Sequence, residues 1–132
     1  MAAINDLEEL LSSMAPELLA GEYVFCTIPN GTYDDSRSLS PLATFMESEG
    51  LTIVVNKDNA DKSGFEYDGV FRCITLTVYS SLEAVGLTAA VSTKLSEHRI
   101  SANIIAAYYH DHVFIPSGVA DKALKLLLEF GK

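Results

Sequence analysis

The chain has 132 residues, of which 48% are hydrophobic and 20% charged, with a formal net charge of −9 at pH 7. This composition predicts a folded domain with a substantial core and excludes a mainly disordered chain. The acidic charge argues against nucleic acid and against an anionic membrane surface as partners, because both require a cationic face. We expect no signal peptide, no membrane span and a cytoplasmic location, since the acidic start and the short apolar runs fit neither kind of segment.

The first half predicts a short helix, two clear strands and a second helix. Apolar residues spaced by three and four predict a helix over 5–13, with Asn5 and Glu8 as a capping-box variant. The β-rich runs 22–28 and 51–56 predict strands. The remaining expectations in this half are a loop over 29–40, a helix from Ser40–Pro41 to Glu49, a polar turn over 57–64 and a short strand over 65–67.

The second half predicts the order β-α-β-β-α. Its elements are expected over 70–79, 84–98, 101–108, 112–115 and 119–130, with a tight turn at His110–Asp111. This order is the split βαβ pattern of ferredoxin-like folds without its final strand. The missing strand must therefore come from the first half of the chain or from a second subunit.

The two halves repeat with a period near 48 residues. Cys26 and Cys73 occupy matching strands, and residues 46–55 align with 95–104. The first half has no helix after its later strands, so we expect helix 5–13 to fill that place from the other end. The predicted fold is α+β, with two ferredoxin-like modules, residues 1–66 and 67–132, that share strands and place helices on one face of antiparallel sheets.

Residues 77–116 resemble an ACT domain, with Gly86 in the first helical turn and the run HRISAN before the next strand. GEYVFCTIPNGTYDD in the first half resembles a divergent ACT-like module, and the tandem layout is similar to that of the eukaryotic cytosolic arginine sensor. The resemblance implies a regulatory amino-acid-binding protein without catalysis or cofactor, and a homodimer. In place of the family's Asp-x-Pro-Gly lead-in, this chain has SSLEAVG at 80–86. The implied ligand residues are Glu83, Val85, Gly86, Leu87, Asn103 and Ile104.

The chemistry of the loop before the second-half helix suits an α-amino acid. Amide groups at a helix N-terminus attract a carboxylate, and Gly86 lets a ligand approach the backbone. Glu83 can accept an ammonium group, and Asn103 can donate and accept hydrogen bonds. The alternative is that Ser80 and Glu83 only form a capping box.

A related site is possible in the long loop of the first half. Asn30 and Gly31, with Asp34 and Asp35, occupy the matching place there, although a plain solvated loop is the alternative.

No catalytic or metal site is expected. His110, Asp111 and His112 are possible metal ligands, but they fall where a hairpin must turn, and no further ligand has a suggestive spacing. The sequence has no nucleophile or phosphate-binding motif. Cys26 and Cys73 are expected to be reduced and buried. The competing functional hypothesis is a protein-interaction module that binds no ligand.

Overall fold

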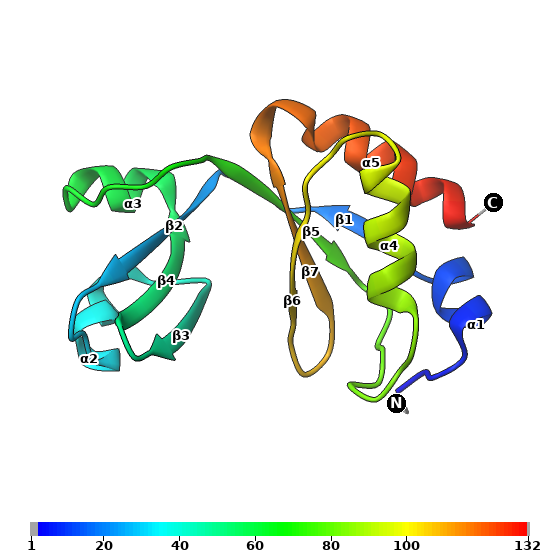
Figure 1. Cartoon of the computed structure of the whole chain (residues 1–132), viewed down its shortest axis with the longest axis horizontal. Helices are drawn as coiled ribbons and strands as arrows, with labels where there is room; N and C mark the ends of the chain where they lie inside the picture. The colour runs from blue at the N-terminus through cyan, green and yellow to red at the C-terminus, as the bar shows by residue number, and fades with distance from the viewer. Residues whose placement is uncertain (1–2, 132) are drawn as a thin grey trace. The chain divides into compact units, whose positions relative to one another are not determined.

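The computed structural model describes residues 3–131, which form two compact units. The N-terminal unit comprises residues 21–71, and the C-terminal unit comprises residues 3–20 and 72–131. Both units are antiparallel sheets packed against helices, as expected for two ferredoxin-like modules (Figure 1). The boundary expected between residues 66 and 67 stays a prediction.

The N-terminal unit has a three-stranded antiparallel sheet in the order β3-β4-β2. Its elements are β2 (Tyr23–Ile28), α2 (Tyr33–Ser36), β3 (Ala43–Glu47), β4 (Gly50–Asn56) and α3 (Lys57–Lys62). Alternate residues of β2 enter the core because successive side chains of a strand point to opposite faces. The buried residues that form the core of this unit are Val24, Cys26, Leu39, Leu51, Ile53, Val55 and Ala60.

The C-terminal unit has the strand order β1-β5-β7-β6. Its elements are α1 (Leu7–Ser12), β1 (Pro16–Leu18), β5 (Phe71–Leu76), α4 (Leu87–Ser96), β6 (Asn103–Ala106), β7 (Asp111–Pro116) and α5 (Ala120–Leu128). β1 pairs antiparallel with β5, with Pro16 opposite Leu76 and Leu18 opposite Ile74. The strand that the second half lacks is therefore supplied by the first twenty residues, one of the two sources expected.

Helices α4 and α5 lie side by side over the sheet of the C-terminal unit (Figure 1). Leu87, Val91 and Leu95 are buried at intervals of four along α4, so one stripe of the helix faces the strands. Leu10 of α1 belongs to the same core. None of the helices within residues 3–131 combines the length and apolar character that a bilayer crossing requires.

The helix expected over 41–49 is wrong, because this segment is strand β3. Ser40 adopts φ 48° as the end of a short 3-10 helix, so it does not cap a new helix. Ala43 to Glu47 then pair with β4 through a two-residue hairpin loop at Ser48 and Glu49. Pairing with a buried neighbour strand therefore overrides the local helix signal at Pro41.

The polar turn expected over 57–64 is wrong as well, because it contains helix α3. Asn56 caps this helix by accepting the N–H of Asp58 at 2.9 Å, and Lys57 bonds Asp61 across one helical turn at 2.9 Å. Ala60 is the fully buried residue of this helix. The cap residue and the spacing of Lys57 and Asp61 were present in the sequence, so this helix was predictable.

Helix α3 occupies the place in the N-terminal unit that helix 5–13 was expected to fill. Helix 5–13 is α1, which packs in the C-terminal unit. The cap of α1 is Asp6, which accepts the N–H of Glu9 at 2.9 Å, and the Asn5–Glu8 pair expected there is wrong. The alignment of 46–55 with 95–104 is also wrong, because Met46 lies in a strand and Leu95 in a helix. Cys26 and Cys73 do occupy the first strand of each β-α-β-β-α unit.

Smaller differences concern loop lengths. The loop expected over 29–40 contains α2 and a 3-10 turn over Arg37–Leu39, and the segment 65–67 is not a strand. The hairpin turn lies at Ala107–His110, where the Ala107 N–H donates to the His110 carbonyl at 3.0 Å, so Asp111 already belongs to β7.

Candidate functional site

The loop of residues 80–86 connects β5 with α4 and is held from two sides. The N–H of Ile4 donates to the Tyr79 carbonyl and the N–H of Ser81 donates to the Ile4 carbonyl, both at 2.9 Å. On the other side, the buried Ser80 hydroxyl donates to Asp111 Oδ2 at 3.0 Å. The Ser80–Glu83 capping box considered above is therefore wrong, since the Ser80 hydroxyl bonds Asp111 of β7 instead.

Gly86 forms the start of α4 with a backbone that favours glycine. Its φ of 99° lies in the left-handed region, and its carbonyl accepts the first helical N–H, that of Ala90, at 2.9 Å. The amides of Leu87, Thr88 and Ala89 precede that first bond, so they can bind an acceptor outside the helix. A methyl group added at Gly86 would lie 3.0 Å from Leu7 Cδ2.

A shallow hollow of about 490 Å³ begins at Gly86 and follows the outer side of α4. Small side chains line its length, and charged groups stand at its far end; the lining residues are Leu7, Gly86, Ala89, Ala90, Thr93, Lys94, Glu97 and Phe130. Lys94 is engaged there, because its ammonium bonds Glu129 Oε1 at 2.6 Å and lies 5.6 Å from the centre of the Phe130 ring. The hollow therefore has the start of α4 at one end and a wall of small side chains along its length.

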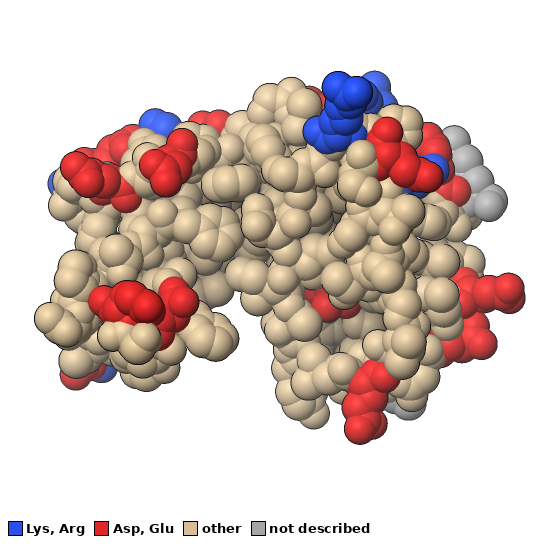
Figure 2. All heavy atoms as spheres, in the orientation of Figure 1, with Lys and Arg blue, Asp and Glu red and all other residues tan. Residues whose placement is uncertain are grey.

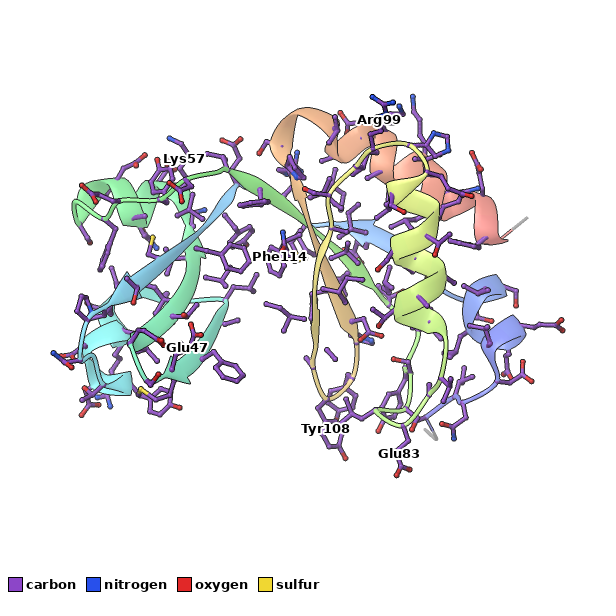
Figure 3. The ribbon with its side chains drawn as sticks, in the orientation of Figure 1. Glu47, Lys57, Glu83, Arg99, Tyr108 and Phe114 are labelled. Atoms are coloured by element: carbon purple, nitrogen blue, oxygen red, sulfur yellow. The ribbon has the colours of Figure 1, made fainter. Side chains whose placement is uncertain are left out.

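The structure brings together only some of the predicted ligand residues. Glu83 and Val85 project from the exposed loop, Val85 being 83% exposed, while the Leu87 side chain is buried in the core. Asn103 and Ile104 begin β6, which starts where the chain returns from the far end of α4 (Figures 1 and 3). A ten-residue helix is about 15 Å long, and β6 begins only after the chain has left the far end of that helix. The ligand roles of Asn103 and Ile104 stay predictions.

Asn30 and Gly31 form a tight turn after β2. Asn30 has φ 55°, and the Gly31 N–H donates to the Ile28 carbonyl at 2.9 Å. A methyl group at Gly31 would lie 2.7 Å from the Ile28 side chain, so glycine is required for packing at this point.

The two aspartates beyond that turn are also engaged locally. Asp35 accepts the Thr32 N–H at 2.8 Å, and Asp34 pairs with Arg37.

His110, Asp111 and His112 do not converge on a common point. His110 Nδ1 lies 3.2 Å from the Val78 carbonyl, Asp111 accepts from Ser80, and His112 Nδ1 lies 2.9 Å from the Thr75 hydroxyl. Within residues 3–131, no group of three His, Cys, Asp or Glu side chains is arranged to hold a metal ion. Burial lowers the pKa of the His112 imidazole; the charge of His110 lowers it further and that of Asp111 opposes the shift.

Three tyrosines gather beside the candidate loop, a feature that the sequence analysis missed. Tyr108 and Tyr109 sit on the β6–β7 turn, and their ring centres lie 4.9 Å apart, edge to face. Tyr79 contacts both rings, at 6.4 and 5.2 Å. Figure 3 shows Tyr108 and Glu83 at the same end of the C-terminal unit. The adjacent tyrosines in AAYYHD were the available signal, since two exposed aromatic residues on a turn are uncommon.

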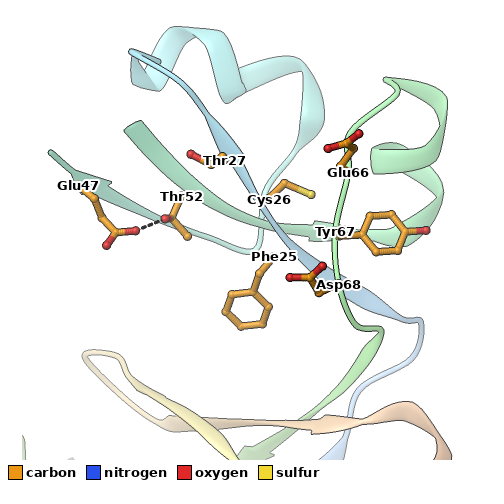
Figure 4. A pocket seen from close by; sticks show the side chains of 8 residues that line it. All are labelled: Phe25, Cys26, Thr27, Glu47, Thr52, Glu66, Tyr67 and Asp68. Atoms are coloured by element: carbon orange, nitrogen blue, oxygen red, sulfur yellow. Dashed lines mark hydrogen bonds between the residues drawn. The ribbon is translucent and has the colours of Figure 1, made fainter. Parts of the chain in front are cut away.

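A second hollow lies in the N-terminal unit and has an acidic lining (Figure 4). Its volume is about 560 Å³, and its lining residues are Phe25, Cys26, Thr27, Glu47, Thr52, Glu66, Tyr67 and Asp68. The Thr52 hydroxyl donates to Glu47, and no lysine or arginine is part of this lining. Figure 2 shows several separate groups of acidic side chains, and lysine and arginine atoms that gather mainly at the top of the view.

Sequence comparison decides the family of this chain. One ACT-domain family model matches residues 2–72 and a second matches residues 70–129. This chain belongs to the ACT-domain family. ACT domains are regulatory modules that bind small molecules and often oligomerise, so this tandem ACT protein belongs to that regulatory class.

Solved structures agree with the tandem ACT fold. A Vibrio cholerae protein of unknown function, described as a possible transport protein, is 57% identical, with a TM-score of 0.87 and coverage of 96% of both chains. The Thermus flavus aspartate kinase regulatory subunit is 11% identical, with a TM-score of 0.67 over 92% of this ACT protein and 99% of that chain. An Agrobacterium tumefaciens protein is 18% identical, with a TM-score of 0.67 and coverage of 88% and 87%. None of the curated proteins matches this sequence significantly.

Proposed function

We propose that this ACT protein is a non-catalytic sensor that binds a free amino acid at the loop 80–86 and the start of α4. The single observation that carries the proposal is the left-handed Gly86 beside a hollow of about 490 Å³, followed by helix amides that precede the first intrahelical bond. A ligand carboxylate would bind these amides, because the helix N-terminus carries partial positive charge. The exposed Glu83 carboxylate would receive the ligand's ammonium group.

Two further features support the amino-acid class. The wall formed by Ala89 and Ala90 accepts an apolar or short side chain. The matched aspartate kinase subunit from Thermus flavus is itself a regulatory chain, and its tandem fold covers 92% of this protein. Asn103 is not part of this proposal, because β6 begins after the chain has left the far end of α4.

The experiment is a thermal-shift screen of the twenty amino acids on the full chain, followed by titration calorimetry of any hit. Ligand at a hundred times its Kd adds about 2.7 kcal/mol of stability, which gives a clear rise in Tm. We expect Glu83→Gln to weaken the hit at least about ten-fold, because one charge-assisted bond is lost. Glu17→Gln, at the exposed residue of β1, is the matched control and leaves affinity unchanged. Absence of any shift across the whole set contradicts the proposal.

We also propose that the protein works as a homodimer.

The alternative function, an assembly module without a ligand, is favoured by one observation: strand β3 is a sheet edge with three exposed apolar residues on or beside it, Leu42, Phe45 and Met46. Self-association without any amino-acid response is the result that selects this alternative.

A further inference from the structure

Two neighbouring loops of the C-terminal unit expose a cluster of large apolar side chains. Residues 80–86 precede α4, and residues 107–110 form the turn between β6 and β7. Four of the six large hydrophobic side chains exposed in the described part of this unit lie on these two loops: Leu82, Val85, Tyr108 and Tyr109. We call these four residues, together with Glu83, the tyrosine patch. Exposed apolar side chains that cluster in this way mark an interaction surface, whereas single ones do not.

The tyrosine patch is held in place by contacts between its two loops. The Ser80 hydroxyl donates to Asp111 Oδ2 at 3.0 Å. The half-buried Tyr79 ring contacts the rings of Tyr108 and Tyr109, with centres 6.4 and 5.2 Å away. These two exposed rings contact each other edge to face at 4.9 Å. Aromatic side chains held in this way lose little conformational entropy on binding, so they are suited to contact a partner.

The charge of the patch restricts the kind of partner. Residues 77–93 and 100–121, which contain both loops, include no lysine or arginine. The exposed Glu83 carboxylate has no ion-pair partner within residues 3–131. Nucleic acid and anionic membranes require a cationic surface, so neither suits the patch. A second copy that covered the patch with its own would bring two Glu83 carboxylates into one interface, which is unfavourable for a chain with a net charge of −9.

We propose that a partner protein docks on the tyrosine patch through a segment that carries an arginine or lysine beside apolar side chains. Its cationic group would lie against the ring of Tyr108 or Tyr109 and pair with the Glu83 carboxylate. Its apolar side chains would cover Leu82 and Val85. Tyrosine and arginine are among the residue types that contribute most to the affinity of protein interfaces. This docking surface goes beyond the amino-acid site proposed above, although Glu83 belongs to both.

The first test measures binding of a defined cationic probe to the full chain in the absence of amino acids. The probe is a fluorescent, acetylated and amidated hexapeptide of alternating arginine and leucine, titrated with protein up to ~1 mM in about 0.15 M salt. We expect wild type to bind it and the double variant Tyr108→Ala/Tyr109→Ala to bind at least about ten-fold more weakly. The control Tyr33→Ala removes a ring that is 60% exposed in the N-terminal unit and leaves the affinity unchanged. Absence of binding to wild type, or equal affinity of wild type and the double variant, overturns the proposal.

A second test concerns the charge at Glu83. Glu83→Lys should weaken binding of the arginine peptide at least about ten-fold, because the ion pair is replaced by repulsion. Glu17→Lys makes the same change in net charge at the exposed residue of β1, and its effect should be smaller. Equal weakening by both variants shows that only the net charge matters and overturns the proposal. A matched peptide with glutamate in place of arginine should not bind wild type, and equal binding of the two peptides contradicts a cationic partner.

Two further measurements locate the bound segment. The arginine peptide should shift the backbone amide resonances of residues 79–86 and 107–111 in wild type, and shifts confined to the N-terminal unit overturn the proposal. Sedimentation velocity should give the same association state for wild type and the tyrosine double variant. Loss of self-association in that variant would assign the patch to a second copy, which also overturns the proposal. Because docking is measured without amino acids and the two tyrosines are not part of the proposed amino-acid site, failure of either proposal is distinguishable from failure of the other.

Discussion

Replacing Gly86 with alanine should destabilise the protein for two separable reasons. An L residue in the left-handed region loses roughly 1–2 kcal/mol. The added methyl group would also lie 3.0 Å from Leu7 Cδ2, which requires local repacking of about 1 kcal/mol. We therefore expect a loss of about 2–3 kcal/mol, which at roughly 3–4 °C per kcal/mol lowers Tm by ~6–12 °C.

Gly64 supplies a matched control within the same chain. Its φ of 75° is also left-handed, but a methyl group there would meet no atom within 4 Å. Gly64→Ala should therefore lose only the backbone contribution, roughly 1–2 kcal/mol. In a Leu7→Ala background, the loss caused by Gly86→Ala should fall to the Gly64→Ala value, because the contact has been removed.

Urea unfolding of these variants, monitored by circular dichroism, measures each loss. If Gly86→Ala is as stable as wild type, the left-handed start of α4 is refuted. If Gly86→Ala and Gly64→Ala lose equal stability in the protein that retains Leu7, the contact with Leu7 contributes nothing.

Two further predictions concern the half-buried His112 and the two buried cysteines. Burial lowers the pKa of His112 in the folded protein below its usual 6.5, so the unfolded chain binds more protons and the free energy of unfolding should fall as the pH drops through 6.5. Urea unfolding at pH 7.5 and 5.5 measures this pH dependence, and His112→Gln should reduce it. An unchanged pH dependence in the variant contradicts the prediction. Burial raises the pKa of the Cys73 thiol to about 11, and burial followed by the charge of Asp61 raises that of Cys26. Neither thiol of the native protein should react rapidly with a chromogenic thiol reagent at pH 8, whereas both should react in urea; rapid native labelling would show an accessible thiolate.

Elements with strong local signals were predicted well. The strands around Cys26 and Cys73 and the helices that contain Val91 and Ala123 follow from apolar periodicity, which survives in the final packing. Helix α3 was missed although Asn56 and the Lys57–Asp61 pair indicated it. Strand β3 was missed because Ser40–Pro41 resembles a helix start, and only pairing with β4 decides otherwise.

The candidate site was likewise predicted where the signal is local and missed where it depends on tertiary packing. The loop before α4 and the position of Gly86 at the start of that helix were anticipated, because a glycine at a helix start has a local conformational reason. The separation of Asn103 from this loop was not, since it depends on where β6 begins relative to the two ends of α4. The contact of Leu7 with Gly86 joins residues 79 positions apart, and no local pattern reports such a contact.

The sequence by itself determined the family, the α+β class and the β-α-β-β-α order of the second half, because these depend on composition, motif and short-range periodicity. The tertiary structure alone decided that β1 completes the C-terminal sheet, that residues 43–47 form an exposed edge, and which residues surround Gly86. The physical reason is that strand pairing and close packing join residues distant along the chain. These interactions stabilise the fold only when the distant residues are in contact, so a local sequence pattern does not report them.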